Sequence, residues 1–121
     1  MLITPARGGY RYSDDAKPRY VYALIFAGGR VYVGQSADPV ARIRQHRRPA
    51  SGWREAFDVL MLEQLDGPEL MAIDREYAWR WSAHLAGLTP ITLHDAYAFD
   101  LSWIRDSAKR LAEYRPWPST T

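Results

Sequence analysis

The sequence predicts a small α/β (α+β) domain, in which a central three-stranded antiparallel sheet is flanked by helices. Three observations predict this class: a hairpin pattern over residues 20–35, a further strand-like run over 56–65, and a helical periodicity on either side of that run. A sheet with an apolar face buries it against helices, which gives a layered domain. The chain has 121 residues, the size of one domain.

The hairpin is the most local of these signals. "YVYALIF", residues 20–26, is β-branched and aromatic, which is typical of a buried strand. "AGGR", residues 27–30, supplies two glycines for a tight reversal, and "VYVGQ", residues 31–35, is the returning strand. Residues 1–18 are rich in Pro, Gly and Asp, so we expect a flexible or irregular N-terminal arm there.

A helix is expected directly after the hairpin, within residues 36–48. Either Ser36 or Asp38 is suited to cap its N-terminus, and Pro39 is suited to its first turn. The helix should end before Pro49, because the residue before a proline avoids helical backbone angles.

The same periodicities predict which side chains face inward. On the helix that follows the hairpin, Val40 and Ile43 should face the core, whereas Arg44 and Arg47 should be exposed. On the third strand, residues 56–65, we expect three apolar side chains on one face, namely Val59, Met61 and Leu65.

The clearest helix lies within residues 66–87. Asp66 or Gly67 is expected to cap it, Pro68 to start it and Gly87 to end it. Its expected inner face repeats at helical spacing and consists of Leu70, Ile73, Tyr77 and Trp81.

The C-terminal part is expected to complete the core. Residues 88–99 are irregular or contain a short strand, and residues 100–115 form a last helix capped by Asp100. Its inward side chains should be Leu101, Ile104, Ala108 and Leu111. The expected organisation is therefore an arm (1–18), a core (19–87) and a C-terminal extension (88–121) whose helix packs on the core.

Composition narrows the class of protein. The chain has no cysteine, which excludes disulfides and thiolate metal sites. It has no apolar run of membrane-spanning length and no signal-peptide pattern, so we expect a cytoplasmic protein without a membrane partner. Residues 21–48 carry five arginines and one aspartate. This basic segment points to a polyanion such as nucleic acid, although solvated surface arginines are the alternative.

Two tyrosines are the first candidates for a site. Tyr22 and Tyr32 lie on strands joined by a tight turn, so both can project from one face of the sheet. The alternative is that both are ordinary strand aromatics whose hydroxyls find partners at the rim.

Arg42 and His46 stand four residues apart and therefore share one face of the helix that follows the hairpin. A guanidinium binds phosphate through two hydrogen bonds, and an imidazole exchanges a proton near neutral pH. A solvated basic face is the alternative interpretation.

Glu76 lies in the middle of the long helix, and a carboxylate is a usual anchor for Mg²⁺. Two alternatives stay open: an ion pair with Arg80 four residues on, and Glu69, which has a similar position on the helix and competes for the same role.

The order of these residues resembles the GIY-YIG nuclease family, which is named after two tripeptides on its hairpin strands. The tripeptides read "VYA" at 21–23 and "YVG" at 32–34 here, and "RVYVGQSADPVARIRQH", residues 30–46, is similar to the central signature of the family. "DREYAW", residues 74–79, resembles the helix that carries the metal-binding glutamate. The likeness covers about residues 19–87. The chain departs from the family pattern at Val21, where glycine is usual, and at Arg30, where lysine is common.

The resemblance implies a metal-dependent endonuclease that hydrolyses phosphodiester bonds in DNA. It implies that Tyr22 deprotonates the attacking water, that His46 accepts or shares the proton, and that positive neighbours lower the pKa of the phenol. Tyr32 would hydrogen-bond the scissile phosphate, and Arg42 would hold its oxygens. Glu76 would bind one Mg²⁺ or Mn²⁺ ion.

Four further residues are expected near the substrate. Arg30 would neutralise charge, Gly34 would let the backbone approach the phosphodiester closely, and Arg44 would contact the backbone of the nucleic acid. Ser36 would cap the next helix and also touch a phosphate. Two other functions stay open: a non-catalytic nucleic-acid-binding module with the same fold, and a structural or partner-binding domain.

Overall fold

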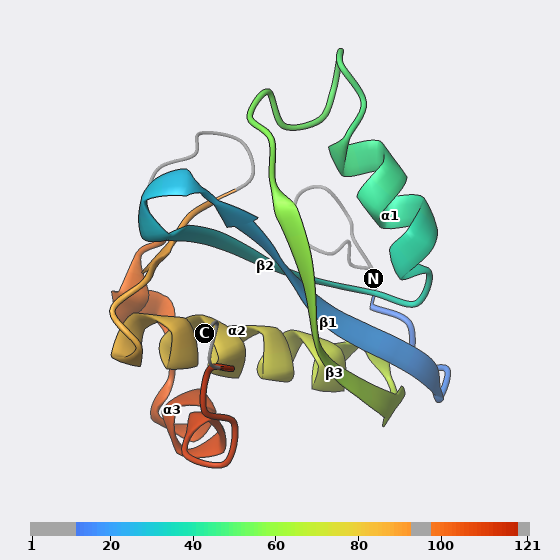
Figure 1. Cartoon of the computed structure of the whole chain (residues 1–121). Coiled ribbons are helices and arrows are strands. Elements are labelled where there is room, and N and C mark those ends of the chain that lie inside the picture. Colours follow the sequence, from blue (N-terminus) through green and yellow to red (C-terminus); the bar gives the residue numbers. More distant parts are fainter. Residues whose placement is uncertain (1–11, 93–97, 119–121) are drawn as a thin grey trace, which may run out of the picture.

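The computed structural model describes residues 12–92 and 98–118, and it confirms the α/β class. The strands are β1 (Lys17–Phe26), β2 (Arg30–Ser36), β3 (Asp58–Gly67) and β4 (Thr89–Pro90). The helices are α1 (Pro39–His46), α2 (Glu69–Leu85) and α3 (Asp106–Ala112), with short 3₁₀ segments at Ala27–Gly29 and Leu101–Trp103. In Figure 1, α1 lies on one side of the sheet, and α2 with α3 lies on the other.

The sheet has four strands in the order β3-β1-β2-β4, one more than the sequence predicts. β1 pairs antiparallel with both β2 and β3, which confirms the predicted hairpin and third strand. The added strand, β4, pairs with Arg30 and Val31 of β2 in the parallel direction, so the sheet is mixed rather than antiparallel throughout. The parallel pairing arises because the long helix α2 carries the chain back across the sheet before β4 begins.

Two apolar clusters cover the two faces of β1, as its alternating side chains require. One cluster lies under α2 and contains Val21, Ala23, Val33, Leu65, Ala72 and Trp79. The other lies on the side of α1 and contains Tyr22, Leu24, Phe26, Phe57 and Ile91, with Ile43 and Trp53 packed against it. The tyrosine of the first candidate tripeptide is therefore a core residue of the α1 side.

The expected inner face of α2 is wrong, because small side chains face the sheet instead. Ala72 and Ala83 are fully buried and Trp79 is nearly so, whereas Leu70 is 50% exposed. The short side chains let the helix approach the sheet closely. Ile73 and Tyr77, two of the larger side chains expected to face the sheet, instead line a hollow between α2 and α3. Within the described ranges, no helix combines the length and the apolar character that crossing a bilayer requires.

The expectation that Val59, Met61 and Leu65 share a face is correct for Val59 and Met61, which pair with Leu24 and Tyr22, and wrong for Leu65. The pairing of β1 with β3 shifts between Val21 and Tyr22, which leaves one extra residue in β3. Such a bulge reverses the alternation of the strand. Val59 therefore packs on the α1 side, Leu65 belongs to the cluster under α2, and Met61 is largely exposed.

The structure shows which residue caps α1, and it contradicts one of the two residues expected to face the core. The side chain of Asp38 accepts a hydrogen bond from the backbone N–H of Ala41 at 3.1 Å, so Asp38 is the cap. Ile43 packs on the core as expected, but Val40 is 60% exposed. The reason is that α1 contacts the sheet through its last turn, where His46 is buried.

The last predicted helix is divided in two. Asp100 caps a short 3₁₀ segment by accepting from the N–H of Ser102 at 3.0 Å, and the backbone at Ile104 is extended. A second acidic start signal at Asp106 begins α3. Ile104 and Ala108 are buried as expected, while Leu101 and Leu111 are half-buried.

A cluster of polar side chains around Glu63 fastens the C-terminal segment to the domain. The Glu63 carboxylate accepts from Trp79 Nε1 at 2.9 Å and from Arg115 Nε at 2.8 Å, and it also pairs with Arg75. The Ser82 hydroxyl donates to the Arg115 carbonyl at 2.6 Å. A single carboxylate thus joins β3, α2 and the chain after α3.

We expect Glu63→Ala to lower the free energy of unfolding by about 3 kcal/mol, because it leaves two guanidinium groups and an indole N–H without their acceptor. Urea denaturation followed by circular dichroism measures this change. Glu113→Ala, at an exposed position of the same charge, is the matched control and should change stability by less than about 0.5 kcal/mol. An equal loss in both variants would contradict the structural role of Glu63.

Candidate active site

The site lies at the outer edge of β2, where the two faces of the sheet meet. In the described part of the chain, β4 covers this edge only at Arg30 and Val31. Farther along, side chains of α2 take its place: Arg80 donates to the carbonyl of Val33 at 3.0 Å, and Glu76 accepts a backbone hydrogen bond from Gln35. Arg80 and Glu76, which come from the α2 side of the sheet, are therefore held at the edge of β2. Tyr32 projects from the opposite face of the same strand.

Gly34 makes room for the two tyrosines. It pairs with Tyr22 across the hairpin, and a Cβ at this position would lie 2.8 Å from the Tyr22 hydroxyl and 3.0 Å from Tyr32 Cε2. The two aromatic rings thus fill the space that a side chain would need. This geometry gives Gly34 a packing role, and its expected role, a close approach of the backbone to substrate, stays a prediction.

The Tyr22 hydroxyl forms a hydrogen bond of 2.7 Å with His46 Nε2. Both residues are buried, with His46 only 4% exposed on the last turn of α1. The ring of Tyr32 meets the imidazole edge-on, with 5.3 Å between the ring centroids. Tyr22, Tyr32 and His46 therefore share one face, and the hydroxyl of Tyr22 is enclosed instead of lying at the rim.

Burial sets the protonation of this pair. It raises the pKa of Tyr22, the neighbouring Tyr32 adds to this effect, and the guanidinium of Arg42 only partly opposes it. Arg42 thus lowers the pKa of this phenol as expected, but burial outweighs its effect and the net shift of the pKa is upward. Burial, reinforced by Arg42, lowers the pKa of His46 to about 4. At neutral pH the imidazole is neutral, and in the tautomer protonated at Nδ1 its Nε2 accepts the hydrogen bond of the Tyr22 hydroxyl.

Glu76 forms an ion pair with Arg80, with 3.2 Å between Oε1 and the guanidinium. Burial raises the pKa of Glu76, while Arg80 and then Arg42 act in the opposite direction. The ion pair that the sequence left as an alternative is thus present. Glu76 still belongs to the cluster despite this ion pair, because the charge of Glu76 raises the pKa values of both Tyr22 and Tyr32.

Arg80 is a site residue whose full role the sequence does not reveal. Its guanidinium lies over the rings of Tyr77, at 5.0 Å from the centroid, and of Phe99, at 4.5 Å. It also bonds Glu76 and the carbonyl of Val33. The i,i+4 spacing predicts the first of these bonds, but only the tertiary structure brings the β2 carbonyl and Phe99 into reach.

Arg42 completes the cluster from the side of the solvent. It is exposed on α1, and its charge affects the pKa of each of the other four predicted residues. The structure therefore brings together Tyr22, Tyr32, Arg42, His46 and Glu76.

The other predicted residues lie outside this cluster. Arg30 pairs with Glu55 through both terminal nitrogens and lies over the ring of Phe26 at the hairpin end. The expectation that Ser36 caps α1 is wrong, because Asp38 is the cap; the Ser36 hydroxyl instead accepts from the N–H of Asp38 at 2.9 Å. Arg44 is exposed on α1.

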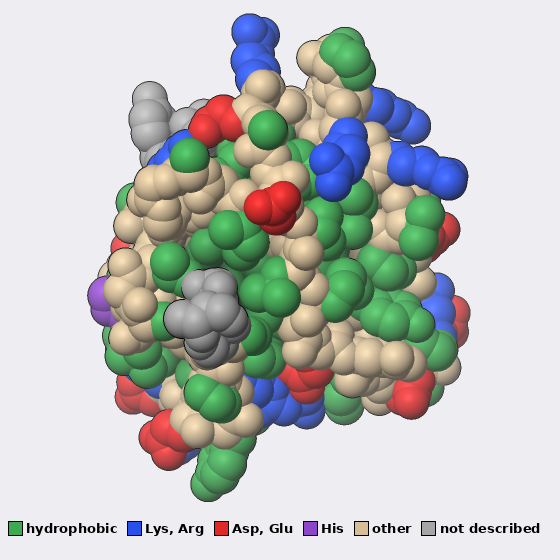
Figure 2. Space-filling model, viewed as in Figure 1, with side chains coloured by type: hydrophobic (Ala, Val, Ile, Leu, Met, Phe, Trp, Pro, Cys, Tyr) green, Lys and Arg blue, Asp and Glu red, His purple; other side chains and the backbone are tan. Residues whose placement is uncertain are grey.

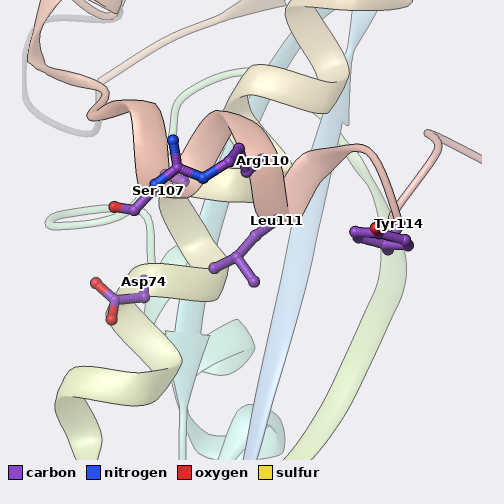
Figure 3. Close-up of a pocket in the computed structure, with 6 residues that line it drawn as sticks. Asp74, Ser107, Arg110, Leu111 and Tyr114 are labelled. Carbon is purple, nitrogen blue, oxygen red and sulfur yellow. The ribbon is translucent and has the colours of Figure 1, made fainter.

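Two further places are separate from the cluster. Glu69 lies in the first turn of α2 and accepts from the N–H of Ser13 at 2.9 Å. A hollow of about 330 Å³ lies between α2 and α3 and is lined by Asp74, Ser107, Ala108, Arg110, Leu111 and Tyr114. Figure 3 shows it with Asp74 on one helix and Arg110 opposite. None of the clustered residues contributes to it.

Comparison with protein-family models, curated proteins and solved structures found no match. The function is therefore inferred from the residues of the cluster and from the resemblance carried by residues 30–46 and 74–79.

We expect Gly34→Ala to lower the free energy of unfolding by about 2 kcal/mol, because the added methyl group displaces the rings of Tyr22 and Tyr32. The imidazole should become more exposed, so the pKa of His46, measured by NMR titration, should rise toward 6.5. A variant with parental stability and an unchanged His46 titration would show that the rings do not depend on this glycine.

The buried imidazole also predicts a pH dependence of stability. In the unfolded chain His46 takes up a proton near its ordinary pKa of 6.5, but in the folded chain only near 4. The unfolded state therefore binds more protons between these values, and stability falls as the pH drops from about 6.5 to about 4. The contribution is on the order of 3 kcal/mol.

His46→Gln should remove this contribution, because glutamine does not titrate. Urea denaturation of the parent and the variant at several pH values gives the two profiles. Their difference should change between pH 7 and pH 4 and stay constant above pH 7. Parallel profiles over the whole range would contradict the burial of a neutral imidazole.

Proposed function

We propose that this chain is a metal-dependent endonuclease of the GIY-YIG type that hydrolyses phosphodiester bonds in DNA. The observation that supports the proposal most is the convergence of a phenol–imidazole pair, a second phenol, a guanidinium and a carboxylate at one sheet edge. Because DNA is found inside the cell, we place the proposed activity in the cytoplasm.

The hydrogen bond between Tyr22 and His46 provides a path for the proton of the attacking water. As the water oxygen forms its bond to phosphorus, its proton passes to the Tyr22 oxygen, and the phenol proton passes to Nε2 of His46. The bond from phosphorus to the 3′-oxygen breaks, and the leaving oxygen takes a proton from solvent. The negative charge of the bound phosphodiester favours the protonated imidazole, which offsets the low pKa of His46.

Arg42 and Tyr32 are placed to stabilise charge on the phosphate. Arg42 is exposed and can direct its guanidinium at two non-bridging oxygens. The hydroxyl of Tyr32 supplies a further donor from the strand below. Because both groups lie beside the proton path, they would favour in-line attack at one phosphate.

The donors present fit one hydrated Mg²⁺ or Mn²⁺. In the described residues, no three acidic or histidine side chains gather into a metal site, so Glu76 is the only protein carboxylate in the cluster. Mg²⁺ keeps several waters and binds through one or two carboxylates together with substrate phosphate. When bound, such an ion polarises the phosphate and stabilises the leaving oxygen. Arg80 acts as a positioning residue, because its ion pair with Glu76 fixes the carboxylate and opposes the rise in pKa that burial causes.

A non-catalytic nucleic-acid-binding module is the second candidate. Two observations favour it: the carboxylate of Glu76 already has a cationic partner in Arg80, and the hydroxyl of Tyr22 is fully buried. Both proposals use the same basic surface, so they differ only in whether the bound strand is cut.

Nicking of supercoiled plasmid with Mg²⁺ or Mn²⁺ distinguishes them. We expect the parent to nick the plasmid and EDTA to stop it. Glu76→Gln should reduce the rate more than about 100-fold while leaving salt-dependent binding of DNA in place. Glu113→Gln, which removes the same charge from an exposed position after α3, is the matched control.

Each outcome has a defined meaning. Parental nicking by Glu76→Gln would refute the assigned site. A parent that binds DNA and never nicks it would establish the binding module, and a parent without salt-dependent binding would refute both candidates.

A further inference from the structure

A basic pocket lies beside the catalytic cluster, at the end of α1. Its volume is about 270 Å³, and it is lined by Arg42, Gln45, His46, Arg48 and Ser51. It shares Arg42 and His46 with the cluster, but its other walls come from the last turn of α1 and the loop that follows. Tyr22, whose hydroxyl bonds His46, is not part of its lining. The pocket is therefore a neighbour of the reaction site and not the same place.

The charge around the pocket is strongly positive. Residues 39–54 contain five arginines and no acidic side chain, and Figure 2 shows basic side chains gathered over α1 and the loop after it. Arg48 is exposed and has no ion-pair partner among the residues that the structure describes. A free guanidinium facing a polar hollow is suited to an anion.

The pocket is built on a fixed loop. The backbone N–H of Gly52 bonds the carbonyl of Arg48 at 2.8 Å, and that of Trp53 bonds the carbonyl of His46 at 2.8 Å. A Cβ at position 52 would lie 2.2 Å from the His46 carbonyl oxygen, so only glycine permits this close return.

The return of the loop also covers the end of the helix. The last turn of a helix normally repels anions through its free carbonyls. Here the carbonyls of Ile43, Arg44, Gln45, His46 and Arg48 all accept backbone hydrogen bonds. The arginines therefore determine the local charge.

We propose that this pocket binds the phosphate next to the scissile phosphate on the same strand. The inference rests on the proposed function. Arg48 binds the oxygens of the neighbouring phosphate, and the Ser51 hydroxyl donates a hydrogen bond to the same phosphate. Arg42 lies between the two phosphates. Contact with two successive phosphates fixes the strand relative to the Tyr22–His46 pair and requires no contact with a base.

The test uses short DNA strands in which one linkage is an uncharged methylphosphonate. The position cut by the parent is mapped first, and the uncharged linkage is then placed on either side of it. Affinity is measured in EDTA, so that binding is recorded without cleavage. Arg48→Ala is compared with Arg110→Ala, which removes the same charge from an exposed position on α3.

We expect the parent to lose about five- to tenfold in affinity when the linkage on one side of the cut is uncharged. Arg48→Ala should bind the normal strand more weakly by a similar factor and show no further loss with the uncharged linkage. Its plot of log affinity against log salt should lose about one unit of slope. Arg110→Ala should keep the sensitivity and the slope of the parent.

The subsite alone would be overturned if the parent cuts DNA and Arg48→Ala stays as sensitive to the uncharged linkage as Arg110→Ala. It would also be overturned if no neighbouring linkage affects the parent. A parent that binds without cutting, or that neither binds nor cuts, overturns the proposed endonuclease and the subsite together, because no scissile phosphate then exists.

Discussion

The incomplete pairing of β2 is the constraint on which the candidate site depends. β4 satisfies only the first residues of this edge, and a buried backbone carbonyl without a partner is costly. Arg80 and Glu76 meet that need from α2 at Val33 and Gln35. The same bonds bring a carboxylate from one side of the sheet to the tyrosines of the other. A complete fourth strand would separate these two groups.

Burial determines the chemistry of the cluster more than its formal charges do. The phenol of Tyr22 and the imidazole of His46 are both neutral in the folded chain, because enclosing a charge in apolar surroundings costs more than Arg42 returns to the phenol. Arg42, by contrast, remains in contact with solvent. The site therefore combines the buried, uncharged pair of Tyr22 and His46 with the solvent-exposed guanidinium of Arg42. This arrangement gives an arriving anion a large influence on the protons of the pair.

The sequence predicts local features of this fold well and long-range features less well. The hairpin, the cap at Asp38 and the helix around Glu76 follow from patterns of a few residues. The bulge opposite Val21 and the outward turn of Val40 do not, because they depend on how β3 and α1 meet the sheet. For the site, periodicity places Arg42 and His46 on one helix face, but the loss of charge at His46 and the second role of Arg80 arise only from burial in the assembled domain.

The polar cluster at Glu63 connects the end of the chain with the placement of the candidate metal ligand. Trp79 stands one turn from Glu76 on α2, donates to Glu63 and packs against Trp117, with 6.0 Å between the ring centroids. Residues near the end of the described chain thus pack along α2, the helix that carries Glu76. A segment some forty positions away in sequence therefore packs on the helix that carries Glu76, and the C-terminal residues support the geometry of the candidate site.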